Sequence, residues 1–280
     1  MTKALALGVL TIALCAATAL AAPGDLDNSF DEDGRRTLDF GGTDVIRDVL
    51  VQPDGKIVLT GDGRALGDVL VTRLNPDGSL DASFDGDGTR EYLLGGVDTG
   101  NAAAVQPDGK ILVAGQTLIS PTTIALVVRL NPDGSTDTGF ADQGELDLTD
   151  AALRTVGEVL VQSDGKILAV GTSDPGNGFA VARFNADGTL DGAFAGDGTA
   201  EIEFNSEAVS IGRAAALQPN GKIVVAGTSG SGADTGVARL NAHGSPDTSF
   251  DGEGRREIFD RTGGPRDVLV QPDGKIVLAI

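Results

Sequence analysis

Short apolar runs separated by clusters of glycine, proline, aspartate and asparagine make up most of the chain. Residues 49–51 (Val-Leu-Val) precede a Gln-Pro-Asp-Gly-Lys turn at 52–56, and residues 57–59 (Ile-Val-Leu) follow it. Two such runs on either side of a tight turn predict a pair of antiparallel strands. Since neither run alternates apolar with polar residues, we expect both faces of the sheet to be covered.

This turn recurs at nearly constant spacing. Its first residue is glutamine at 52, 106, 162, 218 and 271, so the intervals are 54, 56, 56 and 53 residues. A period near 55 predicts an array of equal structural units. Proline and aspartate suit the central positions of a type I turn, and the following glycine suits the left-handed conformation. The glycines expected to adopt it are Gly55, Gly109, Gly165, Gly221 and Gly274.

The unit at 78–133 predicts four strands: a at 89–94, b at 102–106, c at 110–114 and d at 124–130, with Gly115 ending strand c. Units of this kind start near residues 24, 78, 134, 188 and 244. Short strands that need covering on both faces, repeated about five times, predict an all-β, β-propeller-like array of four-stranded repeats. A β-trefoil or a linear β-solenoid would use shorter repeats.

A second motif strengthens this interpretation. The block Arg-Leu-Asn-Pro-Asp-Gly-Ser-Leu-Asp-Ala-Ser-Phe at 73–84 returns at 129–140, 183–194 and 239–250. With the Gln-Pro-Asp-Gly-Lys turn it resembles the delta-60 repeat family of bacterial proteins, over nearly all of residues 24–280. The resemblance implies a propeller-like fold and an exported location, and it brings no established catalytic residues.

The sequence ends within strand c of the fifth unit. Two interpretations stay open: five units close an imperfect ring, or the chain is a fragment of a longer array, without independent activity. In either case the apolar edge at 276–280 is predicted to favour dimerisation or aggregation.

The N-terminal residues 1–22 are predicted to be a cleaved signal peptide, because Lys3, an apolar stretch and Ala19-Leu20-Ala21 follow the usual order of such segments. Residues 23–280 then form a single domain, secreted or periplasmic. A retained transmembrane anchor and a lipoprotein signal at Cys15 are the alternatives, and Leu14 fits the second poorly. Removal of the signal would leave a chain without cysteine, hence without disulfides.

A formal net charge of −20 disfavours binding to nucleic acids and anionic membranes, and leaves cations and basic partners open. The single histidine, His243, stands in a turn, so a Ser-His-Asp triad and a zinc site find little support. A calcium-assisted site or a carboxylate pair would need only acidic residues, of which the chain has 41.

The acidic loops are the candidate calcium sites, because calcium takes oxygen ligands from clustered carboxylates. Their alternative role is turn formation, for which Asp-Gly steps are well suited. No cofactor other than calcium is indicated. The candidate ligands are Asp27, Asp31, Asp33, Asp81, Asp85, Asp87, Asp247, Asp251 and Glu253.

One arginine per unit stands eight residues before an aspartate, which predicts an internal ion pair in each blade. A ring of ligand-binding arginines is the alternative. The arginines are Arg73, Arg129, Arg183 and Arg239, and the phenylalanine that closes each block is expected to fill the space between blades.

Up-and-down strands place the a–b and c–d loops at one end of the molecule. This end varies between units, as the c–d loops expected at 61–68, 116–123, 172–178 and 228–236 show. Variable loops on a rigid scaffold usually carry function. We therefore predict an exported, non-enzymatic scaffold that binds a protein or glycan ligand through this face. The alternative is a calcium-dependent propeller hydrolase of lactonase or esterase type. The candidate ligand-face residues are Asp44, Asp98, Glu158 and Glu207.

Overall fold

A computed structural model describes residues 24–63, 67–174, 176, 178–204, 209–230, 234–259 and 263–280. The predicted signal peptide and Glu207 lie outside these ranges. Within them, no helix has both the length and the apolar character needed to cross a membrane.

The described residues form antiparallel sheets, four of them with four strands and one with two. The first sheet contains β1 (Val45–Val51), β2 (Ile57–Gly63), β3 (Asp68–Leu74) and β4 (Thr89–Tyr92). The second contains β5 (Val97–Val105), β6 (Ile111–Ile119), β7 (Thr122–Leu130) and β8 (Glu145–Asp147). The third contains β9 (Leu153–Val161), β10 (Ile167–Ser173), β11 (Gly178–Phe184) and β12 (Thr199–Glu203). The fourth contains β13 (Ile211–Leu217), β14 (Ile223–Ser229), β15 (Asp234–Leu240) and β16 (Arg255–Ile258), and the fifth contains β17 (Asp267–Val270) and β18 (Ile276–Ala279). A short 3-10 helix, η1 (Thr149–Ala151), precedes β9.

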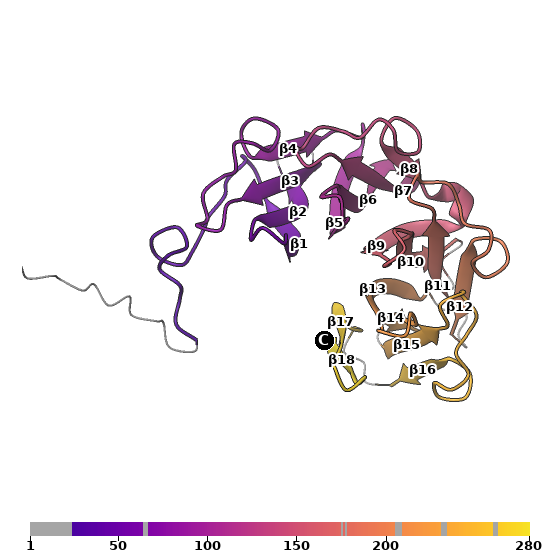
Figure 1. Cartoon of the computed structure of the whole chain (residues 1–280). Helices are drawn as coiled ribbons and strands as arrows, with labels where there is room; N and C mark the ends of the chain where they lie inside the picture. The colour runs from indigo at the N-terminus through magenta and orange to yellow at the C-terminus, as the bar shows by residue number, and fades with distance from the viewer. Residues whose placement is uncertain are drawn as a thin grey trace, which may run out of the picture.

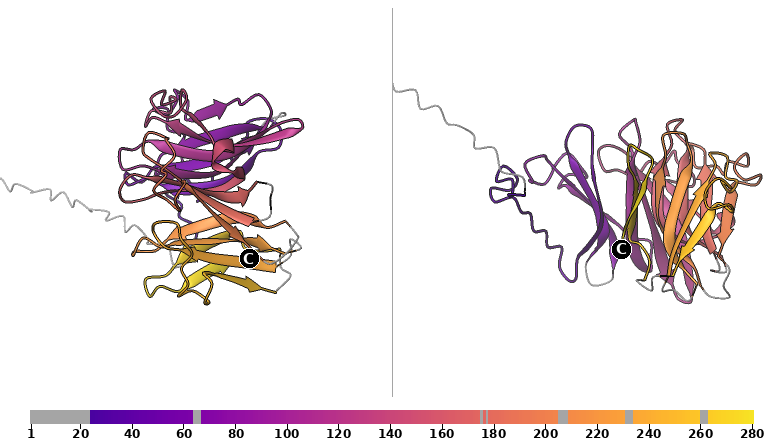
Figure 2. Two further views of the ribbon diagram at one scale, coloured as in Figure 1. Left: turned by 90° about the vertical axis from the view of Figure 1, so that its right-hand side faces the viewer. Right: turned by 90° about the horizontal axis from the view of Figure 1, so that it is seen from below.

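The sheets stand side by side along an arc, as the blades of a propeller do (Figure 1). Strands β1, β5, β9, β13 and β17 lie on the inside of the arc, while β4, β8, β12 and β16 lie on the outside. The strands run along the axis of the arc (Figure 2). This architecture confirms the predicted all-β, propeller-like fold of four-stranded repeats.

Each sheet combines strands from two sequence units. Strand β4, predicted to open the second unit as its strand a, pairs with β3 of the first. A four-stranded sheet therefore holds strands b, c and d of one unit and strand a of the next. This exchange links consecutive units through backbone hydrogen bonds, in addition to side-chain packing.

The strands predicted from sequence were too short on either side of the b–c hairpin, because Gly115 was expected to end strand c. Strand β6 continues through Gly115 to Ile119, and β5 begins at Val97. Parts of the segments predicted as c–d loops, 61–68, 116–123, 172–178 and 228–236, thus belong to strands, namely residues 61–63 and 68, 116–119 and 122–123, 172–173 and 178, and 228–229 and 234–236. The reason is a β-bulge: the register of β5 against β6 shifts between Gly100 and Ala102, opposite this glycine.

The glycine is required because the bulge brings two backbones very close together. In the third sheet a Cβ on Gly171 would overlap the carbonyl oxygen of Thr155. Gly61, Gly115 and Gly227 face the same obstacle in the other sheets. A recurring glycine in mid-strand is typical of such close approaches.

Replacing Gly171 by alanine is expected to destabilise the protein by about 2–3 kcal/mol, because a methyl group is forced against a backbone carbonyl. Gly192→Ala is the matched control, since a Cβ there would have no neighbour within 4 Å. Urea unfolding of the two variants compares them. Equal stability of both would contradict the close approach at the bulge.

Apolar side chains fill the space between neighbouring sheets. Phe84, Phe140 and Phe194 are fully buried at these junctions, one between each pair of consecutive sheets from the first to the fourth. At the two ends of the arc apolar side chains remain exposed: Val49 and Val51 on β1 are 58% and 68% exposed, and Leu269 on β17 is 49% exposed.

Candidate functional site

The recurring arginine of each unit is held by the aspartate eight residues later. Arg129 donates from Nε to Asp137 at 2.7 Å, and Lys110 of the preceding turn donates to the same carboxylate oxygen at 2.8 Å. The hydrogen bond from Lys110, assisted by that from Arg129, lowers the pKa of Asp137 against the opposing effect of burial. The same ion pairs join Arg73, Arg183 and Arg239 to Asp81, Asp191 and Asp247.

The same arginines also reach the next unit. Arg129 donates from Nη1 to the carbonyl of Ala186 at 2.5 Å, and its guanidinium lies 4.2 Å from the centre of the Phe140 ring. Ala141 in turn donates its N–H to the carbonyl of Asp187 at 3.0 Å. This Arg–Asp–Phe cluster therefore ties consecutive units together, with the arginine engaged through Nε, Nη1 and one face of its guanidinium group.

The carboxylates predicted as calcium ligands are distributed over separate local contacts. Asp27, Asp33 and Asp87 accept hydrogen bonds from backbone N–H groups two residues ahead, as turn-forming aspartates do. The others form ion pairs with arginines: Asp31 with Arg36, Asp85 with Arg90, Asp251 with Arg256 and Glu253 with Arg255, while Asp81 and Asp247 belong to Arg–Asp–Phe clusters. Across the described ranges, no three acidic, histidine or cysteine side chains gather as metal ligands would.

The Gln-Pro-Asp-Gly-Lys turns have the predicted geometry. Gly109 has φ of 84° and its N–H donates to the carbonyl of Gln106 at 2.9 Å, while the N–H of Gln106 donates to the carbonyl of Lys110 at 2.8 Å. The equivalent glycines Gly55, Gly165, Gly221 and Gly274 have φ of 85°, 84°, 81° and 82°. These residues serve hairpin formation.

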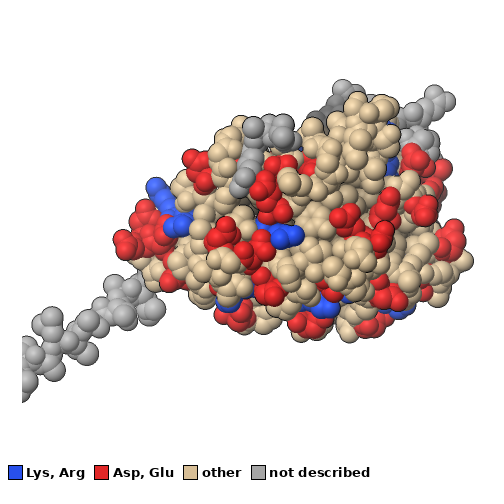
Figure 3. Space-filling model, turned by 90° about the horizontal axis from the view of Figure 1, so that it is seen from above, with Lys and Arg blue, Asp and Glu red and all other residues tan. Residues whose placement is uncertain are grey.

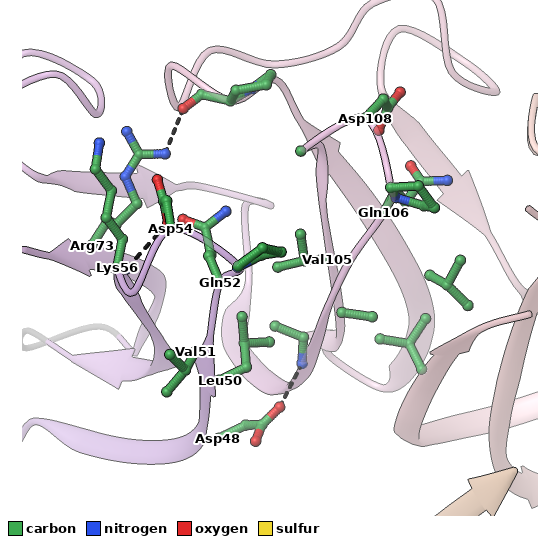
Figure 4. Close-up of a pocket in the computed structure, with 18 of the residues that line it drawn as sticks. Asp48, Leu50, Val51, Gln52, Asp54, Lys56, Arg73, Val105, Gln106 and Asp108 are labelled. Atoms are coloured by element: carbon green, nitrogen blue, oxygen red, sulfur yellow. Dashed lines mark hydrogen bonds between the residues drawn. The ribbon is translucent and has the colours of Figure 1, made fainter. Parts of the chain in front are cut away.

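A hollow of about 1080 Å³ lies on the inner face of the first three sheets. Its walls are aliphatic, with Leu50 and Val105 among them, and Asp54, Lys56 and Asp108 of the turns stand at its rim (Figure 4). Away from the turns, the floor of the hollow is acidic and is formed by Asp48 and Glu158. No aromatic side chain is among the described residues that line it.

The two acidic residues of the floor have different surroundings. Asp48 accepts a hydrogen bond from the N–H of Ala103 at 2.8 Å, which joins β1 to β5 (Figure 4). Burial, followed by the negative charges of Asp48 and Asp267, raises the pKa of Glu158 to about 8. Glu158 is therefore protonated at neutral pH, whereas a carboxyl group in water is ionised there.

Two predicted ligand-face residues, Asp98 and Asp44, accept hydrogen bonds from the backbone. Asp98 is 1% exposed and accepts a hydrogen bond from the N–H of Leu94 at 2.7 Å. Asp44 accepts the equivalent bond from Phe40 at 2.8 Å. Each hydrogen bond thus closes a short loop at the start of an inner strand, β5 for Asp98 and β1 for Asp44. Asp98 and Glu158 also lie in strands β5 and β9, where the sequence predicted loops.

The bulges leave one unpaired residue in each of the inner strands β1, β5, β9 and β13, at equivalent positions of the four sheets. These bulge positions are Arg47 on β1, Asn101 on β5, Gly157 on β9 and Arg213 on β13. The fifth inner strand brings Arg266, which lies just before β17. All five line a second pocket, of about 310 Å³. Since the bulge lies near the start of each inner strand, this pocket is nearer the variable loop end.

A protein-family model matches the recurring part of each unit and leaves out the bulge positions. Residues 52–84, 106–140, 162–194 and 218–250 match the family model described as a domain of unknown function (DUF5122) beta-propeller. The chain carries β-propeller repeats. Each matched DUF5122 segment runs from the glutamine of the turn to the phenylalanine of the Arg–Asp–Phe cluster. The bulge positions on the inner strands lie outside the matched segments.

The β-propeller repeats also resemble solved structures at low identity. A protein of unknown function from Bacteroides caccae is 13% identical, with 83% of this chain covering 69% of that one at a TM-score of 0.48. An exo-β-1,3-galactanase from Clostridium thermocellum is 13% identical, with 84% of this chain covering 52% of that one at a TM-score of 0.44. A GH43 β-1,3-galactosidase is 11% identical, with 81% and 82% covered at a TM-score of 0.46. No curated protein sequence matches the chain.

The bulge arginines have a signal in the sequence, although they belong to neither recurring motif. Arg47, Arg213 and Arg266 each stand five residues before the glutamine of a turn, and the other two units have asparagine and glycine there. Because the residue type is not the same in all units, this position does not stand out as part of the repeat.

Proposed function

We propose that the protein is an exported, non-enzymatic binding scaffold, and that its ligand binds at the inner strands, toward the variable loop end. The observation that carries the proposal is the repeated bulge, which brings Arg47, Asn101 and Arg213 from separate units to one place in the fold. A β-bulge commonly re-aims a side chain near a functional site.

The distribution of structural contacts supports this proposal. The residues that recur in every unit form ion pairs, cation–π contacts and turns, as the Arg129, Asp137 and Phe140 cluster illustrates. They are thus engaged in holding one unit against the next, which repeat proteins require. The bulge positions, which are not occupied by one residue type in all units, include Arg47, Asn101 and Arg213, and these line the pocket.

The proposal of export depends on the predicted signal peptide and on the resemblance to the delta-60 repeat family. We also propose that the chain belongs to that family. A secreted or periplasmic site would give the scaffold access to extracellular ligands. The exposed apolar residues at both ends of the arc are compatible with the predicted edge-mediated dimer.

Thermal unfolding of the full chain tests the scaffold function. We would use citrate, inorganic phosphate, spermidine, maltotriose and calcium chloride as binding probes, and nitrophenyl glycosides and esters as hydrolysis probes. A ligand of the folded state raises the midpoint with its concentration. The proposal expects a saturable rise with at least one binding probe and no turnover. Turnover, or no rise with any probe, would contradict it.

Glu158 favours one second candidate, a hydrolase with a carboxylic acid as proton donor. A carboxyl group with a pKa raised to about 8 beside the carboxylate Asp48, in one hollow, resembles the acid and its partner in carboxylate-pair hydrolysis. If hydrolysis of a nitrophenyl substrate is found, Glu158→Gln should abolish it and Glu201→Gln, on the outer strand β12, should not. Unchanged turnover in Glu158→Gln would remove this candidate.

A further inference from the structure

We propose that Arg213, Arg266 and Arg47 form a binding site for a small oxyanion ligand, one that carries carboxylate, phosphate or sulfate groups. The site deepens the proposed scaffold function, because it names the chemistry that the inner pocket recognises.

The fold brings the three arginines together from distant parts of the chain. They come from the first, fourth and fifth inner strands or their starts, and they line one pocket of about 310 Å³ together with Asn101 and Gln116. A volume of this size is at the lower end of the range found for small-molecule sites, roughly 300–1,000 Å³. Asn101 donates to the carbonyl of Val156 at 2.7 Å, which fixes one wall of the pocket.

Two of the three arginines of this pocket have no ion-pair partner among the described residues. Arg213 is half-buried, and its Nε is buried without a hydrogen-bond partner. Among the described residues, neither Arg213 nor Arg266 takes part in an ion pair, whereas Arg47 pairs with Asp62. The neighbouring Asp267 accepts a hydrogen bond from the N–H of Val268 at 2.6 Å. A buried donor without a partner is costly, so a ligand that accepts from it gains affinity.

The two unpaired arginines also repel each other. Burial, and then the positive charge of Arg266, lower the pKa of Arg213. An anion between the two guanidinium groups would relieve both effects, because planar guanidinium groups match the geometry of carboxylate and phosphate oxygens.

The positive charge of this arginine cluster contrasts with the acidic character of the rest of the chain. The net charge is −20, and on the face shown in Figure 3 acidic side chains are spread widely while lysine and arginine are few. The arginines of the Arg–Asp–Phe clusters are neutralised by aspartates, as Arg73 is by Asp81 at 2.6 Å. The inner pocket is thus a local positive site on an acidic protein, which selects a small anion over an extended polyanion that would meet the acidic surface.

Isothermal titration of the full chain with citrate, inorganic phosphate and sulfate, at an ionic strength held constant with sodium chloride, tests the site. The proposal expects saturable binding of at least one of these anions. The anion that binds most tightly identifies carboxylate, phosphate or sulfate as the preferred group. Arg213→Met should weaken its binding at least about tenfold, because a hydrogen bond to a charged group is lost.

A thermal readout separates a ligand-binding role from a structural one. Arg213→Met should keep or raise the midpoint of the ligand-free protein, because it removes an unpaired, half-buried charge. A structural arginine would lower the midpoint on replacement. Arg266→Gln, at an exposed position, should also weaken anion binding, while Arg90→Gln on β4, an arginine paired with Asp85, should leave it unchanged.

Binding of equal strength in the wild type, Arg213→Met and Arg266→Gln would overturn the proposal, as would the absence of binding by all three anions. In those cases a saturable response to spermidine or maltotriose would leave the scaffold function in place and move its ligand elsewhere on the inner strands.

Discussion

Replacing Asp137 by asparagine is expected to lower the free energy of unfolding by about 3–5 kcal/mol, the usual cost of removing one partner from a buried ion pair. The change leaves the side-chain volume in place but removes the charge that Arg129 and Lys110 share. The Arg129 side chain is 8% exposed, so water cannot replace the lost partner. Urea unfolding at neutral pH measures the difference.

Asp85→Asn is the matched control for this change. Asp85 pairs with Arg90 at 3.3 Å, and the two side chains are 28% and 31% exposed. Surface pairs of this kind contribute about 0–1 kcal/mol. If Asp137→Asn unfolds at the same urea concentration as Asp85→Asn, the Arg–Asp–Phe cluster does not hold the units together as we describe.

The stability of the protein is expected to fall as pH rises from about 5 to 8.5, and Glu158 is the cause. Its pKa is raised from an ordinary 4.5 to about 8 in the folded protein. Between these values the unfolded chain has released the proton while the folded chain retains it. The folded state binds more protons in this window, so stability is lost as pH rises, by about 3–5 kcal/mol in all.

Glu158→Gln should remove most of this pH dependence, because glutamine stays neutral at every pH in the window. Glu201→Gln, exposed on β12, should leave the dependence as it is in the wild type. The free energy of unfolding, measured in urea at pH 5 and at pH 8.5, gives the comparison. A wild-type stability that is the same at both pH values would refute the burial of Glu158 beside Asp48.

Local sequence signals accounted for the repeat and for the contacts inside it. The Pro-Asp-Gly turns required a left-handed glycine, and Gly109 has that conformation. The spacing of Arg129 and Asp137 indicated an ion pair within one unit, and the two side chains meet at 2.7 Å. Both features depend on residues that are close in the chain, so their geometry follows from backbone rules.

Features that depend on the pairing of distant strands could not be predicted in the same way. Gly115 was interpreted as the end of a strand, but it lies opposite a bulge and the strand continues to Ile119. Similarly, the proximity of Arg213 to Arg266 and Arg47 arises only when the inner strands of separate sheets are placed around one axis. Sequence alone gives each of these residues no partner.

The most direct test of the account is to locate the bound ligand by hydrogen–deuterium exchange of the full chain, with and without the probe that gives the largest thermal shift. We expect protection to be concentrated in peptides from the inner strands β1, β5, β9 and β13, which carry the bulge positions. Protection confined to the outer strands β4, β8, β12 and β16, or to the repeated turns, would contradict it.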